Sequence, residues 1–426
     1  MACKVLIISN NCLSRYNSNG RTLLNLLGEF QNSELYQFYI ANEEPTEGFC
    51  SKFLRITDRD VLKSFGFAKR HFMIWDWELI KQGNIENLTG KKVNYGKKTV
   101  AKSFVRDFIW GASAWVANEL ENFIHNNGIN VIVLQAGDNV FLHKLARKVS
   151  RKSGRPLIIY NTEDYYFKDY NYIKGTLKCD CLYKFYHHGF CKEFERLIRC
   201  SSAEVYNCIG LQKIYNSTFK KNGVSIYAAT TFQAVENVNK EGLISYTGNL
   251  SCGRHKVLME VANSLQSISD KLYLDVYGPC DEKVLKDFQD CQGIRYHGFV
   301  SYQEVCRVMS ASRLLVHVES FEPYYKRDTR FAFSTKLADY GASNIPVFIC
   351  APSTSETYDY MTEHEIAFVA KDSSEIESKL REALFNEEER KLKSERALQL
   401  SKKNNNYQIN GRLFRNVVEG IINATE

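Results

Sequence analysis

A lysine and an aspartate stand three residues apart near the start of a predicted helix, where they could act on one ligand. Ser334 is a suitable N-cap, because its hydroxyl can accept hydrogen bonds from first-turn amides. Lys336 and Asp339 then follow on one helix face, and Pro346 ends the helical segment. A cation suits a phosphate and a carboxylate suits sugar hydroxyls, so the pair predicts a site for a nucleotide sugar.

The segment before this helix predicts the strand that must position it. The apolar run 314–318 is typical of a parallel strand covered on both faces, and a polar loop with Glu319 and Glu322 follows it. A helix start beside the end of a parallel strand is where open α/β sheets bind ligands. The free amides and the helix dipole there favour an anion such as a diphosphate.

The stretch ESF, an acidic loop, and STKLADYGASNIPV resembles the signature of family 4 retaining glycosyltransferases, which have the GT-B fold. Glu319 matches the first acidic position of that signature and Asp339 the second, where glutamate is usual. The sequence departs from the pattern in the long loop between the acids and in Asn344, which replaces a glycine. It looks most like the branch that builds bacterial capsules and surface polysaccharides.

The resemblance implies how a donor would be held. The strand, loop and helix around 244–268 resemble the family segment in which an arginine clamps the diphosphate, and Arg254 matches that arginine. Catalytic roles are implied for Glu319, Arg254 and Lys336, and donor binding for Asp339, Ser334, Thr335, Gly248 and Asn249. The implied donor is a nucleoside-diphosphate sugar, with a UDP-sugar favoured over a GDP-sugar. No metal ion and no further cofactor are implied.

Polar residues at strand ends in the first half are candidates for acceptor contacts. These are Asn19, Gly20, Gln135, Asp138 and Asp164. For the segment around Gly20 the alternative is a glycine-assisted turn. For Asp164 the alternative is a charge pair at a helix start.

The length of 426 residues exceeds one ordinary core and predicts two domains. Strand and helix patterns alternate from end to end, so the expected fold class is α/β, with two Rossmann-like doubly wound domains facing a central cleft, as in GT-B proteins. We expect an N-terminal acceptor-binding domain over 1–234, a linker at 235–242 and a nucleotide-sugar-binding domain over 243–405. A final helix at 406–426 is expected to return to the N-terminal domain.

Charge is uneven along the chain. Residues 1–230 contain 32 Lys and Arg against 21 Asp and Glu, whereas residues 231–426 contain 24 against 28. A basic first half predicts an anionic partner, either a membrane surface or a diphosphate-linked acceptor, and no nucleic-acid-binding motif accompanies it. The four tryptophans and the basic run 91–102 suit a membrane interface, and the alternative is that the tryptophans are core and the lysines a solvated loop.

Several other classes lose support from the sequence. There is no dinucleotide-binding glycine motif, P-loop, zinc-protease motif or nucleophile elbow. Thirteen cysteines without a signal peptide or an apolar run of membrane-spanning length predict a reducing, cytoplasmic setting, which includes the inner face of the plasma membrane. The cysteines and histidines of 179–191 lack a usual zinc spacing.

We therefore expect a retaining, metal-independent glycosyltransferase that moves a sugar from a nucleoside diphosphate to a hydroxyl of a lipid-linked surface glycan. Two alternatives remain open. One is a catalytically silent partner subunit with the same fold, and the other is a nucleotide-sugar epimerase, which would need positioned acid and base groups.

Overall fold

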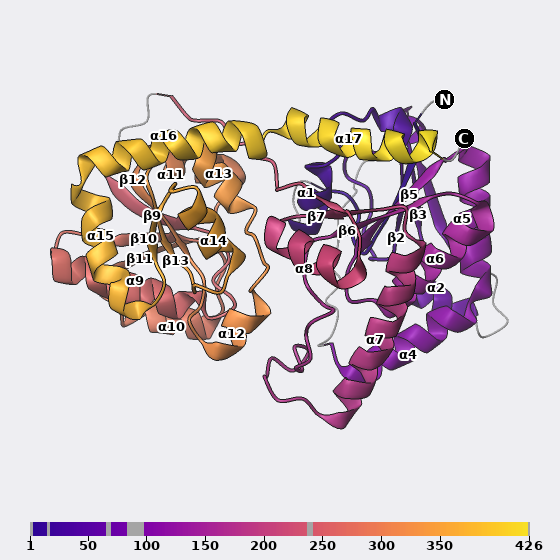
Figure 1. Ribbon diagram of the computed structural model, residues 1–426, viewed down its shortest axis with the longest axis horizontal. Helices are drawn as coiled ribbons and strands as arrows, with labels where there is room; N and C mark the ends of the chain where they lie inside the picture. Colours follow the sequence, from indigo (N-terminus) through magenta and orange to yellow (C-terminus); the bar gives the residue numbers. More distant parts are fainter. Residues whose placement is uncertain (1–2, 15–17, 65–69, 83–97, 237–241, 425–426) are drawn as a thin grey trace. The chain divides into compact units, whose positions relative to one another are not determined.

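Two structural units make up the protein in the computed structural model, which describes residues 3–14, 18–64, 70–82, 98–236 and 242–424 (Figure 1). Unit 1 comprises Met1–Tyr227 and Gln408–Glu426, and unit 2 comprises Ala228–Tyr407. Each unit is built around its own sheet, so each is described by itself.

In its described part, unit 1 contains an eight-stranded sheet with the order β4-β3-β2-β1-β5-β6-β7-β8. Neighbouring strands are parallel except for β4, which is antiparallel to β3. All residues of β1 and β2 are buried, as expected for central strands with helices on both faces. The strands are β1 (Val5–Ser9), β2 (Leu35–Tyr39), β3 (Lys52–Arg55), β4 (Met73–Asp76), β5 (Val131–Ala136), β6 (Leu157–Asn161), β7 (Ala203–Tyr206) and β8 (Val224–Ser225).

The helices of unit 1 connect and cover these strands. Thr57 starts one of them with a capping box, because its hydroxyl accepts from the amide of Asp60 while the Asp60 carboxylate accepts from the Thr57 amide. The helices are α1 (Ser18–Leu24), α2 (Asp58–Lys63), α3 (Trp77–Gln82), α4 (Val100–Ala112), α5 (Ala114–Asn127), α6 (Val140–Ser153), α7 (Cys181–Cys200), α8 (Ile209–Phe219) and α17 (Tyr407–Asn423).

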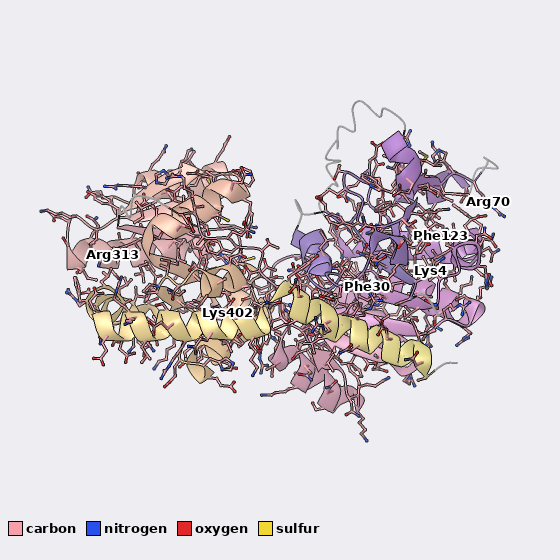
Figure 2. The ribbon with its side chains drawn as sticks, turned by 90° about the horizontal axis from the view of Figure 1, so that it is seen from above. Lys4, Phe30, Arg70, Phe123, Arg313 and Lys402 are labelled. Carbon is pink, nitrogen blue, oxygen red and sulfur yellow. The ribbon has the colours of Figure 1, made fainter. Side chains whose placement is uncertain are left out.

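Helix α17 completes the core of unit 1 from the far end of the chain. Phe414 and Val418 are buried in the same cluster as the residues of the sheet. The ring of Phe414 lies 6.1 Å from that of Phe30, which Figure 2 shows beside α17. Arg415 donates to both carboxylate oxygens of Glu34, at 2.8 and 3.1 Å. The C-terminal helix therefore belongs to unit 1 by both apolar packing and a bidentate ion pair.

In its described residues, unit 2 has a six-stranded, all-parallel sheet with the order β11-β10-β9-β12-β13-β14. Numbered within the unit this is 3-2-1-4-5-6, the order of doubly wound nucleotide-binding folds, and its switch point lies between β9 and β12. The strands are β9 (Leu243–Thr247), β10 (Leu274–Tyr277), β11 (Ile294–Gly298), β12 (Ser312–Val318), β13 (Val347–Cys350) and β14 (Phe368–Ala370).

Helices alternate with these strands along the chain. Asn344 has a φ of 56° just after the helix that precedes β13, where a left-handed residue ends a helix. The helices are α9 (Arg254–Ile268), α10 (Glu282–Gln289), α11 (Tyr302–Ala311), α12 (Pro323–Asp328), α13 (Lys336–Ala342), α14 (Glu356–Glu363), α15 (Ile376–Phe385) and α16 (Glu387–Asn404).

The boundary between the units lies earlier than the predicted end of the first domain at residue 234. Ala228 and Thr230 already pair with the end of α16, since Asn405 donates to the Ala228 carbonyl at 2.7 Å and accepts from the Thr230 amide at 2.8 Å. Contacts far apart in sequence thus fix this segment to unit 2. Of the predicted linker 235–242, residues 237–241 lie outside the described part.

The tryptophans of unit 1 are core residues. Trp110 and Trp115 are buried, and Trp75 and Trp77 are half-buried against the main cluster of the unit. The packed alternative therefore holds for these side chains. Of the basic run 91–102, residues 91–97 lie outside the described part.

Candidate active site

The candidate site lies at the switch point of unit 2, where the carboxyl ends of β9 and β12 meet. Gly248 follows β9 with a φ of 152°, and a Cβ atom there would collide with Nζ of Lys336. Gly278 follows β10 with a φ of 154°, and a Cβ atom there would collide with the carbonyl oxygen of Gly248. These glycines let the loops and the lysine pack without intervening side chains.

A buried carboxylate stands at the end of β12, held by two partners. Arg254, the first residue of α9, donates from Nη2 to one oxygen of Glu319 at 2.8 Å. Nε2 of His317 lies 3.0 Å from the other oxygen. His317 and Glu319 come from the end of β12 and Arg254 from the start of α9, so the fold assembles this cluster before any ligand binds.

The environment fixes the charge of each member of this cluster. Burial opposes ionisation of Glu319, but Arg254 and His317 outweigh it and lower its pKa to about 2. Burial lowers the pKa of His317 to about 4. Burial also disfavours the charged form of Arg254, yet the carboxylate of Glu319 raises its pKa above the ordinary value. At neutral pH the cluster therefore contains an arginine cation, a carboxylate and a neutral histidine that donates from Nε2.

Lys336 adds a second cation beside this cluster. Its Nζ donates to the hydroxyl of Tyr246 at 3.0 Å and lies 4.1 Å from the centre of that ring. Burial is the main reason that the pKa of Lys336 falls to about 7, and Arg254 lowers it further, while Glu319 opposes the change. The amine is thus poised to gain a proton when negative charge arrives.

The site contains more basic groups than carboxylates that could neutralise them. Arg254 and Lys336 supply two basic groups, and the same carboxylate, that of Glu319, acts to raise the pKa of each. In addition, Nε of Arg254 is buried and has no hydrogen-bond acceptor among the described residues. Buried donors without acceptors favour an anionic ligand.

Helix α13 positions Lys336 through one tyrosine. The hydroxyl of Tyr340 accepts from the amide of Thr247 at 3.2 Å and lies 3.2 Å from the carbonyl of Val316. It therefore fixes the helix to the ends of both β9 and β12. Because Tyr340 is four residues after Lys336, the same face of α13 also presents the amine to the site.

The predicted N-cap role of Ser334 is wrong. Helix α13 begins at Lys336, and its N-cap is Thr335, which has helical dihedral angles and makes no side-chain capping bond. The carbonyl of Ser334 accepts from the amide of Leu337 at 3.0 Å, so a continuous turn replaces the side-chain cap. Both Ser334 and Thr335 are half-buried immediately before the helix.

The other two predicted donor residues, Asp339 and Asn249, form hydrogen bonds with other residues of unit 2. Asp339 is buried and accepts a hydrogen bond of 2.6 Å from the hydroxyl of Thr230. Asn249 is exposed, and its side-chain oxygen accepts from the amide of Ser251 at 2.8 Å. Its carbonyl accepts from Tyr246 at 2.7 Å, so Asn249 braces the loop that also contacts Lys336 through that tyrosine.

A second site candidate is a cavity of about 760 Å³ in unit 1. It lies at the carboxyl ends of β1 and β5, the two strands that flank the switch point of this sheet. Asn10, just after β1, and Asp138, just after β5, line it. Helix α4 contributes the apolar side chains Val105, Ile109 and Trp110 and also charged ones such as Arg106. The cavity therefore combines polar and apolar lining residues, as small-molecule sites commonly do.

Two cations that line the cavity, Lys98 and Arg106, each have a carboxylate partner. Asp138 forms an ion pair with Lys98 and accepts from the hydroxyl of Tyr172 at 2.9 Å. Burial opposes its ionisation, but Lys98 keeps its pKa below the ordinary value. Arg106 donates to Asp58 at 2.8 Å. Paired charges with aromatic walls suit a neutral polyol better than a free anion.

The structure places one of the five predicted acceptor residues in the lining of this cavity, namely Asp138. Asp164 accepts from Tyr215 at 2.8 Å and from the amide of Phe167 at 3.1 Å, so it braces its own loop. Gln135 is half-buried on β5. Asn19 and Gly20 lie in the first turn of α1, and the side chain of Asn19 is outside the description.

Residues that the sequence did not single out contribute to both sites. In unit 2 they are His317, Tyr246 and Tyr340. A signal existed for His317, because it stands two residues before Glu319 and neighbouring alternate positions of a strand share a face. Of the cavity residues, Lys98 belongs to the basic run 91–102, whose role the sequence left open, and Arg106 gave no signal.

Within the residues that the structure describes, no group of three or more His, Cys, Asp or Glu side chains is arranged to hold a metal ion. No helix in that part of the chain is long and apolar enough to span a membrane. The 13 cysteines, all of which are described, are free thiols.

Comparison with known proteins agrees with this architecture. A family model described as glycosyl transferase-like matches residues 254–414, a range that includes Arg254, Glu319 and Lys336. The comparison with curated proteins found no match. Among solved structures, sucrose-phosphate synthase from Thermosynechococcus elongatus is similar over 99% of both chains, with a TM-score of 0.66 and 9% identity.

Two further structures have the same two-domain α/β fold. HepE of Anabaena, in complex with UDP-glucose, is similar over 98% of this chain and 99% of its own, with a TM-score of 0.61 and 10% identity. WaaG, a glycosyltransferase involved in lipopolysaccharide biosynthesis, is similar over 98% of this chain and 100% of its own, with a TM-score of 0.58 and 11% identity. The chain has the GT-B fold. At these identities the likeness establishes the GT-B architecture, and the chemistry rests on the site itself.

Proposed function

We propose that the protein is a retaining glycosyltransferase that transfers a sugar from a nucleoside-diphosphate sugar to a hydroxyl of a lipid-linked surface glycan. The observation that carries the proposal is the cluster of Arg254, Lys336 and Glu319 at the switch point of unit 2. The glycosyl transferase-like match over 254–414 and the UDP-glucose complex of HepE support it. A UDP-sugar is the favoured donor.

In this proposal the two cations stabilise the leaving group. The bond between the anomeric carbon and the diphosphate oxygen breaks, and its electron pair stays on the diphosphate beside Arg254 and Lys336. The acceptor oxygen bonds to the anomeric carbon on the face that the diphosphate leaves, and its proton passes to a leaving-phosphate oxygen. Two half-buried cations can stabilise this charge without a divalent metal ion.

The carboxylates have binding roles in the same scheme. Glu319 is fixed and ionised by Arg254 and His317, so it can accept hydrogen bonds from hydroxyls of the transferred sugar. Asp339 is proposed to hold the ribose hydroxyls, in exchange for its present bond to Thr230. Both roles use acceptor-only groups on a polyol.

The acceptor is proposed to bind in the cavity of unit 1, where Asp138 is the predicted contact. The paired charges and the aromatic wall suit sugar rings, and the basic first half suits a diphosphate-linked lipid carrier. We accordingly place the enzyme in the cytoplasm, in peripheral contact with the inner face of the plasma membrane.

The first test is thermal stabilisation of the protein by a panel of UDP-, GDP-, CMP- and dTDP-sugars. We expect a rise in Tm with one nucleotide class, lost in Lys336→Ala and retained in Lys371→Ala, which removes an exposed lysine of the same unit. No rise with any donor would favour the silent partner subunit instead.

A matched pair of variants tests Asp339 in the same experiment. Thr230→Val removes the hydroxyl that now bonds to Asp339 but leaves the carboxylate, whereas Asp339→Ala removes the carboxylate. We expect the donor-induced rise in Tm to persist in the first variant and to be lost in the second. Equal loss in both would assign Asp339 to support of the fold.

A further inference from the structure

Unit 1 exposes a set of large apolar side chains on two neighbouring helices. On α4 they are Val105, 58% exposed, and Phe108, 72% exposed. On α7 they are Leu182, 51% exposed, and Phe185, 69% exposed. We name these four residues, with Leu177 just before α7, the α4–α7 surface. Exposed aromatic and aliphatic groups of this size gathered on one face mark an interaction site more often than chance placement does.

The two helices present these side chains together. Figure 1 shows α4 beside the N-terminal part of α7 at the lower edge of unit 1. The ring of Phe104 lies 5.7 Å from that of Phe185 and 5.5 Å from that of Tyr186, which joins the helices below the surface. Phe108 follows Phe104 by one helical turn, so it extends the same face along α4.

The exposed residues of α4 follow helical spacing. Ala101, Val105, Phe108 and Ala112 are all exposed and recur every three or four residues. This is an apolar stripe on the outer side of the helix, while Ser103 and Trp110 are buried on its inner side. The stripe is therefore not accounted for by the core of unit 1.

Cations border the apolar side chains. Lys102 on α4 and Lys184 on α7 are exposed, and so is Lys178 just before α7. The nearest acidic residue of α4, Asp107, accepts from the amide of Phe141 and lines the cavity. Asp180 is ion-paired with Lys174. The surface therefore presents apolar groups within a positively charged rim.

We propose that the α4–α7 surface docks the protein on an anionic lipid bilayer. The apolar side chains enter the interface between headgroups and acyl chains, and the surrounding lysines attract anionic headgroups. A surface that binds a soluble protein would have both acidic and basic residues around its apolar patch. Around the α4–α7 surface the exposed charged residues are basic on both helices. Charge complementarity thus favours a membrane over a protein as the occupant.

The position of the cavity fits this docking. Val105 belongs to the α4–α7 surface and also lines the cavity, as do Lys98 and Lys102 at the start of α4. A ligand anchored in the bilayer would then meet the cavity at the membrane surface. This last step rests on the proposed function, because that proposal supplies the lipid-linked acceptor.

The test is flotation of the full chain with vesicles of phosphatidylcholine, with and without about one third phosphatidylglycerol. We expect the protein to float with the anionic vesicles and to bind them at least tenfold less when Phe108 and Phe185 are both replaced by Asp. The matched control is Phe385→Asp, which changes a 62% exposed phenylalanine at the end of α15 in unit 2. This control should float as the wild type does.

Charge reversal gives a second measure. Lys178→Glu with Lys184→Glu should weaken binding to the anionic vesicles and leave binding to neutral vesicles unchanged. Failure of the wild type to float, or equal floating of wild type and the Phe108→Asp, Phe185→Asp variant, would overturn the proposal. A dimer that this variant dissociates in sedimentation without vesicles would overturn it too, in favour of a second copy of the chain.

Donor binding separates this proposal from the proposed function. The surface variants should keep the rise in Tm given by the nucleotide sugar, because their substitutions lie in unit 1. If the protein floats but binds no nucleotide sugar, the docking surface stands and the glycosyltransferase proposal fails. If it binds the sugar but does not float, the reverse holds.

Discussion

The candidate site of unit 2 and the cavity of unit 1 occupy equivalent places in two similar sheets but differ in their electrostatics. Both lie at the carboxyl end of the first strand, beside the switch point of a sheet whose order is 4-3-2-1-5-6-7-8 in unit 1 and 3-2-1-4-5-6 in unit 2. In unit 2, Arg254 and Lys336 share one carboxylate, Glu319. In unit 1, Lys98 and Arg106 each have a carboxylate partner, Asp138 and Asp58.

This difference determines which kind of ligand each unit can bind. A site with surplus basic groups gains from an anion, which restores the charge that burial removes from Lys336. A site with paired charges gains nothing from an added anion and suits hydroxyl groups. Substitutions of the basic groups in unit 2 should therefore weaken donor binding, whereas substitutions in unit 1 should not.

The largest effect is expected for Arg254→Ala, which leaves Glu319 buried without its cation. Removing one partner of a buried pair costs about 3–5 kcal/mol of unfolding free energy. Donor binding should weaken by about 30-fold or more, since truncating a buried charged partner costs at least about 2 kcal/mol. Urea unfolding and calorimetric titration with UDP-glucose measure the two effects.

A double variant separates stability from binding at the same position. Replacing Arg254 by Met and Glu319 by Gln removes both charges of the pair. Much of the lost unfolding free energy should return, because no unpaired charge stays buried. Donor binding should not return, and recovery of both together would contradict a direct role of Arg254 in holding the donor.

The next largest effect is a loss of stability at low pH caused by His317. Its pKa is about 4 in the folded protein against an ordinary 6.5, so the unfolded chain binds the proton first as the pH falls. Stability that is present above pH 6.5 should be lost progressively down to pH 4, by on the order of 3 kcal/mol. Unfolding of His317→Gln, which keeps a donor for Glu319 but does not titrate, should lack this part of the loss. Parallel pH curves for the two proteins would show that His317 is not buried as described.

The pH dependence of donor affinity tests Lys336. With a pKa of about 7 in the free protein, the amine is neutral at higher pH, and the diphosphate should favour its protonated form. Affinity for UDP-glucose should therefore fall above pH 7, by up to about tenfold per pH unit, while the pKa in the complex exceeds the pH. Lys336→Arg should flatten the curve, because arginine does not titrate in this range. A flat curve for the wild type would show that Lys336 does not sense the donor.

The smallest effect is expected in unit 1. Asp138→Asn removes one partner of an ion pair whose lysine side chain is 41% exposed, so the unfolding free energy should change by less than about 1 kcal/mol. Donor affinity should not change, because Asp138 belongs to unit 1 and the basic groups that hold the donor belong to unit 2. Transfer to an acceptor should fall. A loss of UDP-glucose binding in this variant would break the contrast between the two sites.

Much of the architecture was predictable from local patterns. Apolar runs such as 314–318 are followed by helical periodicity, and they predicted parallel strands and doubly wound sheets, as observed for β12 and its neighbours. The left-handed Asn344 was predictable from residue type and its place before Pro346. The start of α13 was not, because Ser334 and Thr335 are both good caps and the turn that joins them depends on tertiary packing.

The candidate site was predictable only in part. Arg254, Lys336 and Glu319 carried motif signals, but their burial and their mutual effect on pKa depend on segments about 65 residues or more apart. The hydrogen bond between Asp339 and Thr230 was not predictable either, because no local sequence pattern relates these two residues. The exposed apolar stripe of α4 was hidden because a sequence period does not say which face of a helix is covered.

The decisive experiment is calorimetric titration of UDP-glucose into wild type, Lys336→Ala and Lys371→Ala at pH 6.5. We expect saturable binding to the wild type and to Lys371→Ala, and an affinity lower by about 30-fold or more in Lys336→Ala. Equal affinity of all three proteins would contradict the claim that the basic groups at the switch point of unit 2 hold the donor.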